Sequence, residues 1–402
     1  MKRVLIILAI AMVATLFVLG TNPAVEAKAI RVGWIGILSG PGASAGKPIL
    51  DGSQLAVNEI NEQGGVKVGA SKRQLELISR DSKGRPEEAV RVARELILKE
   101  KVDYIVGPFT DASNMAVSQV SKELKTIIMP YVAKTMNLLA PDNFHPYVFQ
   151  PSSNTKYEAA VAAKFLLFNP RWQTVFLIAP DYEYGQSCVK EYQKILADKP
   201  QVKIVGVAMP KLFETDFSPY ITQILQKKPD VLHVMQWGGD FVTLLKQCKT
   251  YGVSDVVKQV TTVGEDGTPE LCIASGDAYP EGVYANSMEM FYYPETPEHM
   301  AYVEGMKKLT GEKYVSGYAI QGYIAVQFLA EATQQARSTK SLKVVEALEG
   351  LTVDTPVGKQ TMGKDHQQRR GMFWGLSKAV PEYPFKILDP IEYVPFEEWM
   401  VR

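Results

Sequence analysis

The sequence lacks an excess of charge of either sign. Its 44 lysines and arginines balance 44 aspartates and glutamates, so the formal net charge at pH 7 is zero. Proteins that bind nucleic acid need a basic surface that neutralises phosphates. The balanced composition excludes such a broad positive field, and we expect no nucleic-acid partner.

Cysteine is scarce, and the three cysteines match no metal-binding spacing: Cys188, Cys248 and Cys272. An odd count leaves at least one thiol free. Cys248 and Cys272 could pair in an oxidising compartment, but the helical patterns around Cys188 and Cys248 favour buried free thiols. The sequence also has no P-loop and no H-E-x-x-H motif. We therefore predict no metal and no cofactor.

Long apolar runs are missing beyond the N-terminus. There, two basic residues precede an apolar run from Val4 to Leu19, and small residues follow. This is the layout of a secretory signal peptide, with cleavage at Ala27 or Ala29, whereas an uncleaved membrane anchor needs a longer run. We predict a signal peptide over residues 1–27 and a mature chain that is exported to the periplasm and soluble.

What the sequence does contain is a regular alternation of short apolar segments and helical patterns. Such alternation indicates βαβ units and parallel sheets with helices on both faces. The predicted strands are 31–38, 74–80, 103–106, 126–129, 174–178, 202–208, 231–235 and 256–263. The predicted helices are 47–61, 86–100, 112–124, 184–196, 216–227, 240–251, 297–309, 318–336 and 341–348. The pattern restarts after a polar stretch near residue 150, which predicts two doubly wound α/β lobes in tandem.

A G-x-S-x-G motif, Gly42 to Gly46, follows the first strand and raises the alternative of a hydrolase with Ser44 as nucleophile. In the hydrolase fold the nucleophile follows several strands, whereas here it follows the first one. Few bases are available, because the chain has only four histidines: His145, His233, His299 and His366. We therefore predict no enzyme and no catalytic residues, and the hydrolase stays the alternative to test.

The same turn also resembles a dinucleotide fingerprint, but its spacing is wrong. The glycines give G-x-G-x-x-x-G, and Asp81 lies 35 residues beyond Gly46, against about 20 for the ribose-binding acid of that motif. A glycine-rich turn between a parallel strand and a helix is, however, where open α/β sheets bind ligands. Similar turns recur as "GPFTDAS", "APDYEYGQ" and "QWGGD", which predicts a ligand cleft between two facing lobes.

Longer segments carry a family resemblance. "RVGWIGILSGPGASAGKPILDGSQLAVNEINEQGGV", "LELISRDSKGRPEEAVRVARELI" and "VDYIVGPFTDAS" resemble the first lobe of periplasmic leucine/isoleucine/valine-binding proteins, the type I solute-binding fold of ABC importers. "APDYEYGQS" and "FETDFSPYITQILQKKPDVLHV" resemble the second lobe. The resemblance runs from about residue 30 to 376. It implies a three-segment hinge between an N-terminal lobe of residues 30–150 plus about 287–355 and a C-terminal lobe of residues 151–286 plus about 356–402.

The resemblance further implies a monomeric receptor that captures a branched-chain or other apolar amino acid by hinge closure and delivers it to a membrane ABC permease. The alternatives are an aromatic or aliphatic carboxylate or amide as ligand, or a ligand sensor with the same fold.

The resemblance also assigns ligand-binding positions. Glu265 falls where an acid receives the ligand's ammonium, but Asp111 stands where an anion-binding group is expected and Ala133 lacks a hydroxyl. The partner of the ligand carboxylate therefore stays open among Thr110, Ser113 and backbone N–H groups. The predicted ligand-binding residues are Ser39, Ala45, Thr110, Asp111, Ser113, Tyr131, Val132, Ala133, Tyr184, Trp237, Glu265 and Tyr318. Four of these are aromatic and predict an aromatic wall.

Overall fold

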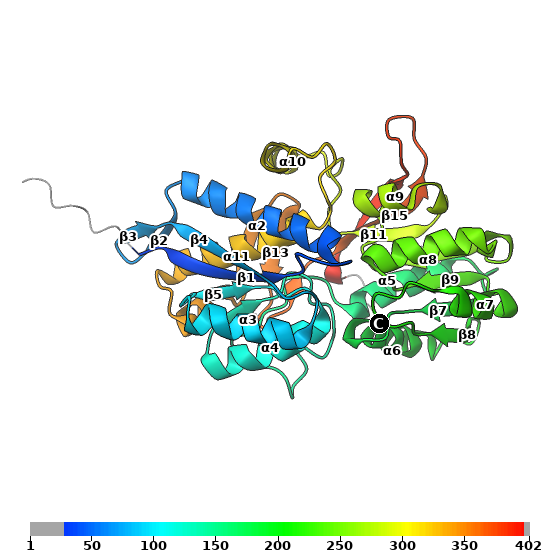
Figure 1. Ribbon diagram of the computed structural model, residues 1–402, viewed down its shortest axis with the longest axis horizontal. Coiled ribbons are helices and arrows are strands. Elements are labelled where there is room, and N and C mark those ends of the chain that lie inside the picture. Colours follow the sequence, from blue (N-terminus) through cyan, green and yellow to red (C-terminus); the bar gives the residue numbers. More distant parts are fainter. Residues whose placement is uncertain (1–27, 398–402) are drawn as a thin grey trace, which may run out of the picture.

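The computed structural model describes residues 28–397, so the predicted signal peptide, residues 1–27, lies outside the described residues. Two α/β lobes lie side by side, the first mostly blue, cyan and orange and the second mostly green (Figure 1). Within the described part of the chain, no helix combines the length and the apolar character needed to cross a bilayer.

The first lobe is built on a parallel sheet of order β4-β1-β5-β6. Its strands are β1 (Ile30–Gly36), β4 (Leu75–Asp81), β5 (Tyr104–Val106) and β6 (Ile127–Met129). Helices cover both faces, and the largest helix–helix contact joins α2 to α11 on one face while α3 packs on α4 on the other. Its helices are α2 (Ala43–Glu62), α3 (Pro86–Leu98), α4 (Asp111–Leu124), α10 (Pro297–Thr310), α11 (Ala319–Ala336) and α12 (Ser341–Leu348).

The second lobe is built on a sheet of order β16-β15-β11-β10-β9-β7-β8, parallel from β11 to β8 and closed by two antiparallel strands. Its strands are β7 (Thr174–Ile178), β8 (Lys203–Ala208), β9 (Val231–Val234), β10 (Gln259–Thr262), β11 (Tyr284–Ser287), β15 (Met372–Lys378) and β16 (Ile387–Val394). Its α-helices are α5 (Thr155–Phe168), α6 (Glu183–Leu196), α7 (Ser218–Lys227), α8 (Gly238–Thr250) and α9 (Pro269–Ser275). In Figure 1, α8 and α9 lie on one face of this sheet, and α5 and α6 lie on the other.

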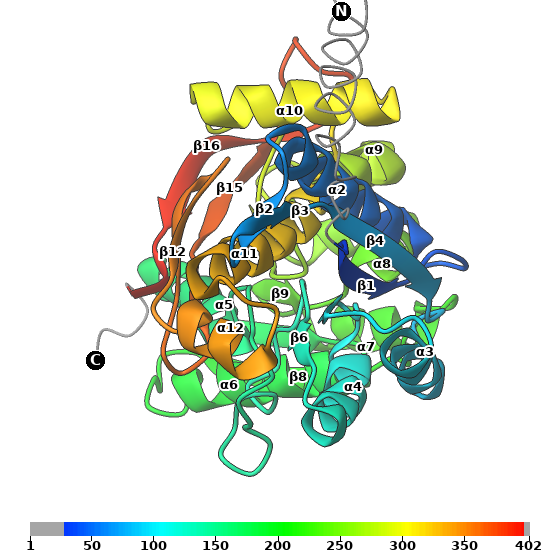
Figure 2. The ribbon, with the colours of Figure 1, turned by 90° about the vertical axis from the view of Figure 1, so that its left-hand side faces the viewer.

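Two smaller sheets complete the first lobe. The hairpin β2 (Val66–Val68) and β3 (Ser71–Arg73) lies at its far end, and the sheet of β12 (Thr352–Thr355), β13 (Gly358–Met362) and β14 (Gln368–Arg369) contacts α11 (Figure 2). Strand β14 leads into β15 of the second sheet. The division of residues between lobes stays a prediction.

The three links between the lobes lie together as a hinge. The backbone N–H of Gln150 donates to the carbonyl of His366 at 2.8 Å, and the N–H of Gln368 donates back to Gln150 at 2.9 Å. The guanidinium of Arg370 donates to the carbonyl of Met288 at 3.2 Å, which joins the second link to the third. These cross-bonds confirm the three-segment hinge of the predicted fold.

The predicted elements match the structure closely, with two informative differences. The first helix begins at Ala43, so Ser44 lies in the first turn of α2 and not in a preceding loop. Helix α5 was not predicted, because apolar residues such as Val161 and Leu166 occur around much of its circumference and leave no amphipathic pattern. The three cysteines are buried and free, as expected.

Candidate ligand-binding cleft

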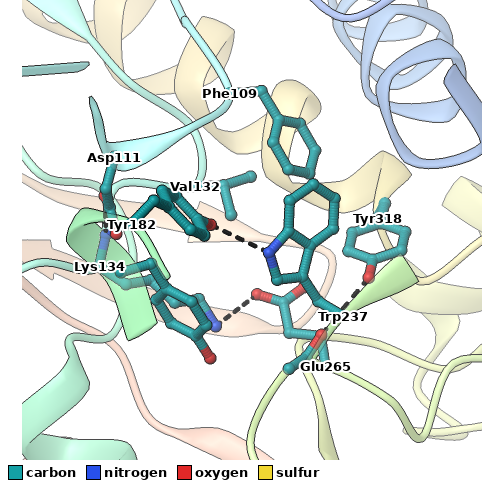
Figure 3. Close-up of a pocket in the computed structure, with 10 residues that line it drawn as sticks. Phe109, Asp111, Val132, Lys134, Tyr182, Trp237, Glu265 and Tyr318 are labelled. Carbon is teal, nitrogen blue, oxygen red and sulfur yellow. Dashed lines mark hydrogen bonds and ion pairs between the residues drawn. The ribbon is translucent and has the colours of Figure 1, made fainter. Parts of the chain in front are cut away.

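A cavity of about 30 Å³ lies between the two lobes (Figure 3). Its lining residues are Phe109, Asp111, Val132, Lys134, Tyr182, Tyr184, Trp237, Gly264, Glu265 and Tyr318. Ligand pockets in proteins span roughly 300–1,000 Å³, and a space of this size holds only a water or two. The lobes are therefore closed on each other, and an organic ligand requires them to part or the wall to move.

The lining residues come from the carboxyl ends of parallel strands in both lobes. Phe109 and Asp111 follow β5, and Lys134 follows β6 in the first lobe, whereas Trp237 follows β9 and Glu265 follows β10 in the second. In open α/β sheets the loops at this edge are the ones that bind ligands. The fold thus brings these four loops, which are distant in the chain, to one point.

Aromatic rings form most of the wall and connect the lobes. Phe109 packs against Trp237 across the cleft, with ring centroids 5.1 Å apart. The indole N–H of Trp237 donates to the hydroxyl of Tyr182 at 3.0 Å, and the hydroxyl of Tyr318 donates to the carbonyl of Gly264 at 3.4 Å. These bonds satisfy the polar atoms of the rings, so the wall offers a ligand mainly apolar aromatic surface.

A buried ion triad lies beside the aromatic wall. The ammonium of Lys134 contacts carboxylate oxygens of both Glu158 and Glu265, at 2.7 Å for Glu265, and all three side chains are at most 4% exposed. The second oxygen of Glu265 accepts a hydrogen bond from the amide of Gln321. Lys134 belongs to the first lobe and the two glutamates to the second, so the triad spans the cleft.

Burial and pairing shift the pKa values of Glu158 and Lys134. Burial raises the pKa of Glu158 to about 7, despite the opposing effect of the Lys134 ammonium. Burial by itself lowers the pKa of Lys134, but the charges of Glu158 and Glu265 outweigh it, and the pKa ends above its usual value. The lysine is therefore charged at neutral pH.

Glu265 also has an unusual backbone. Its φ is 61°, in the left-handed region that non-glycine residues rarely adopt, and its N–H donates to the amide oxygen of Asn286 at 3.1 Å. Strained backbone of this kind gathers at ligand sites, which agrees with a binding role for this carboxylate.

Asp111 fixes the loop that carries Lys134. Its two carboxylate oxygens accept hydrogen bonds from the backbone N–H groups of Lys134 and Thr135, at 2.9 and 3.1 Å. Burial raises the pKa of Asp111 to about 7 although these bonds favour the charged form. Both carboxylate oxygens of Asp111 are thus used in hydrogen bonds to the backbone. Asp111 therefore has a structural role at a position where an anion-binding group was expected.

Of the twelve predicted ligand-binding residues, six line this cavity: Asp111, Val132, Tyr184, Trp237, Glu265 and Tyr318. Tyr184 is held by a hydrogen bond from its hydroxyl to the carbonyl of Val263 at 3.1 Å. Trp237 is only 7% exposed, so the closed lobes shield it from solvent.

The other six do not reach the cavity, for identifiable reasons. Ser39 is exposed and donates to the carboxylate of Asp81 at 2.5 Å. Tyr131 donates to the carbonyl of Ile35 at 2.8 Å and stacks on Trp34 in the core. The remaining four are buried beneath the loops: Ala45, Thr110, Ser113 and Ala133. Thr110 caps α4 by accepting from the N–H of Ser113.

Four lining residues were not predicted: Phe109, Lys134, Tyr182 and Gly264. Lys134 follows the assigned residue Ala133 directly, and its signal was available as a single charged residue in the apolar stretch "IIMPYVAKTM". Buried lysines almost always have a charged partner, but Glu158 lies in the unpredicted helix α5. The pairing was therefore not visible in the sequence.

The enzyme alternatives find no support at their motifs. Ser44 is exposed in α2, and no hydrogen bond joins it to a described histidine. Each histidine ring bonds another residue: His145 to Ser118, His233 to Thr261, His299 to Glu289 and His366 to Val148. The carboxylate of Asp81, the candidate ribose ligand, accepts from Ser39 and from the N–H groups of Leu38 and Lys83. Among the described residues, no cluster of acids, histidines or cysteines is placed to hold a metal.

Two doubly wound lobes that close an aromatic, charged cleft between their loop edges define a protein that encloses a small solute. The sequence profile of the periplasmic binding protein family matches residues 29–375, and the chain belongs to this family. The fold and the family agree with the prediction.

Individual relatives agree with this assignment. The Leu/Ile/Val-binding protein BraC3 of Rhizobium johnstonii is 25% identical over 341 residues, covering 83% of this chain and 88% of its own. A solute-binding protein of an ABC transporter from R. palustris, solved with 4-hydroxybenzoate, superposes with a TM-score of 0.82 at 21% identity, covering 93% and 99% of the two chains. LivJ of Streptococcus pneumoniae, solved with isoleucine, superposes with a TM-score of 0.78 at 18% identity, covering 91% and 99%.

Proposed function

We propose that this protein is the extracytoplasmic, non-enzymatic solute receptor of an ABC importer and that it captures an apolar amino acid between its lobes. The observation that carries the proposal is the interlobe cavity, where an aromatic wall from both lobes adjoins the carboxylate of Glu265. Aromatic rings suit an apolar side chain, and Glu265 suits an ammonium. The named ligands of the relatives, leucine, isoleucine and valine, support the same class.

Capture works by a shift between open and closed lobes. The ligand binds the closed form better and so raises its population. Contacts such as Phe109 on Trp237 are formed only when the lobes close, so a ligand that separates these rings must replace their contact with its own. The closed receptor then docks on a membrane permease as a monomer released from its signal peptide.

A thermal-shift screen of the mature chain tests the proposal. Twenty amino acids, 4-hydroxybenzoate, benzoate and simple amides are each added at millimolar concentration. A ligand present at 100 times its dissociation constant stabilises the folded state by about 2.7 kcal/mol, which is readily seen as a higher melting temperature. Stabilisation by apolar amino acids supports the proposal, and stabilisation by none of them refutes it.

An aromatic carboxylate is the second candidate. One observation makes it a candidate: Glu265 already receives an ammonium from Lys134, so this carboxylate does not require one from the ligand. The R. palustris relative solved with 4-hydroxybenzoate is of the same fold. In the screen, this candidate predicts that 4-hydroxybenzoate stabilises the protein and that leucine does not.

A further inference from the structure

We infer that Lys134 is the residue that receives the ligand's carboxylate, and that the Lys134–Glu265 pair together recognises the zwitterion of an α-amino acid. The inference rests on the proposed function and deepens it. It names the partner that the sequence left open, since Thr110 and Ser113 are turned away from the cavity and bond each other at 2.7 Å.

The ammonium of Lys134 has a donor left for a ligand. An ammonium has three N–H groups. One donates to Glu158, and the carboxylate of Glu265 lies 2.7 Å from the same nitrogen as an ion contact. No further acceptor is found among the described residues. Lys134 lines the cavity (Figure 3), so its remaining donor is available to an anionic group placed there.

The ammonium of Lys134 and the carboxylate of Glu265 are neighbours at 2.7 Å. The two charged groups of an α-amino acid are also neighbours, because a single carbon atom joins them. A ligand lying along the pair places its carboxylate on Lys134 and its ammonium on Glu265, so each charge faces charges of opposite sign.

Lys134, Glu158 and Glu265 sum to minus one when all are ionised. A zwitterion leaves this sum unchanged, whereas an acid without an amino group takes it to minus two in a site closed to water. Uncompensated buried charge is strongly unfavourable. The triad thus favours an amino acid over the carboxylate of the same shape.

Asp111 acts as a positioning residue in this arrangement. Its carboxylate accepts hydrogen bonds from the backbone N–H groups of residues 134 and 135, and no hydrogen bond joins it to the Lys134 ammonium. It sets where the lysine side chain leaves the loop, and it does not itself meet the ligand carboxylate.

Three probes of one shape separate the two charges: L-leucine, 4-methylpentanoate, which lacks the amine, and 3-methylbutylamine, which lacks the carboxylate. Their binding to the mature chain is measured by calorimetry. The test variant combines Lys134→Met with Glu158→Gln. The double substitution keeps the summed charge of the triad, and it removes the carboxylate of residue 158, which would otherwise lose its ion partner. Its matched control is Lys359→Met with Asp354→Asn, an ion pair whose side chains are 73% and 81% exposed.

The expected result is selective. The Lys134→Met/Glu158→Gln variant binds L-leucine about tenfold to a hundredfold more weakly, the range for a charged hydrogen bond, and binds 3-methylbutylamine as the wild type does. Glu265→Gln weakens L-leucine and the amine but not 4-methylpentanoate. The exposed control changes none of the three. A general folding defect would weaken all probes alike, so the ratio between probes reports the role of Lys134.

Two outcomes overturn the inference, and they are distinguishable. If the wild type binds L-leucine and the Lys134→Met/Glu158→Gln variant binds it equally well, the assignment of Lys134 is wrong while the proposed function stands. If the wild type binds neither L-leucine nor any other amino acid, the proposed function fails and the inference fails with it.

Discussion

Replacing Lys134 with methionine should destabilise the protein severely, because it leaves two carboxylates buried without their counter-ion. The side chains of Glu158 and Glu265 are 0% and 2% exposed. Removing one partner of a buried ion pair costs about 3–5 kcal/mol, and whole domains are stable by only about 5–15 kcal/mol. We expect Lys134→Met to lose about 3–5 kcal/mol of unfolding free energy.

Adding Glu158→Gln to Lys134→Met should cause little or no further loss. Glu158→Gln alone leaves Lys134 paired with Glu265, and we expect a smaller loss of about 1–2 kcal/mol. In the Lys134→Met/Glu158→Gln variant the carboxylate nearest the missing ammonium is gone as well. The double variant should therefore be more stable than the sum of the two single losses predicts, by about 2 kcal/mol, within the range for residues in contact.

Urea unfolding, followed by circular dichroism at pH 8, measures this cycle. The pH is set above the pKa of about 7 for Glu158, so that its carboxylate is charged. The exposed pair Lys359 and Asp354 serves as control, because it has a similar separation of 2.6 Å but is solvated and should contribute no more than about 1 kcal/mol. Losses at Lys134 and Glu158 that add within about 0.5 kcal/mol would show no energetic coupling and would refute the buried triad.

Three further predictions follow from other contacts. The pKa of about 7 for Asp111 lies above its usual value, so its contribution to the stability of the folded state is present at pH 4 and lost as the pH rises through 7. The urea midpoint of the wild type should therefore fall between pH 4 and 8, and it should fall less in Asp111→Asn. Gly107→Ala should destabilise by about 1–3 kcal/mol or more, because at φ 97° its Cβ would meet the carbonyl oxygen of Ile35 at 2.0 Å. Gly239→Ala, whose Cβ would meet only one carbonyl at 3.9 Å, should leave the melting temperature nearly unchanged. Ligand binding should alter tryptophan fluorescence through Trp237, and Trp237→Phe should remove the larger part of the change; an undiminished signal would place the ligand elsewhere.

The sequence predicted the fold well because strands of a parallel sheet are buried on both faces. Segments such as Thr174–Ile178 are apolar without interruption and end at turn residues, so their bounds can be read directly. Helix α5 could not be read in this way, since a helix that is apolar on several sides has no periodic signal. Strands β12 to β14 are short, and their pairing depends on α11, which lies nearby only after folding.

The place of the cleft was also predictable, whereas the direction of individual side chains was not. Parallel topology brings the turns after β9 and β10 to one edge of the second sheet, which located Trp237 and Glu265, and the turn after β5 lies at the corresponding edge of the first sheet. Whether a side chain on such a turn faces the cavity depends on its tertiary partner. Ser39 bonds Asp81 and Tyr131 bonds the carbonyl of Ile35, and neither partner is close in sequence.

Lys134 links these observations to closure of the lobes. Parting of the lobes would expose the Lys134 ammonium and the two carboxylates to water, and closing them would exchange this hydration for the ion contacts. The two contributions largely cancel for a buried ion pair, so the triad itself provides little net drive to close. It does set a condition, because closure without Lys134 would bury two unpaired carboxylates. A ligand therefore shifts the equilibrium between open and closed lobes through the contacts that it adds: apolar contact with the aromatic wall, and charges that complement Lys134 and Glu265.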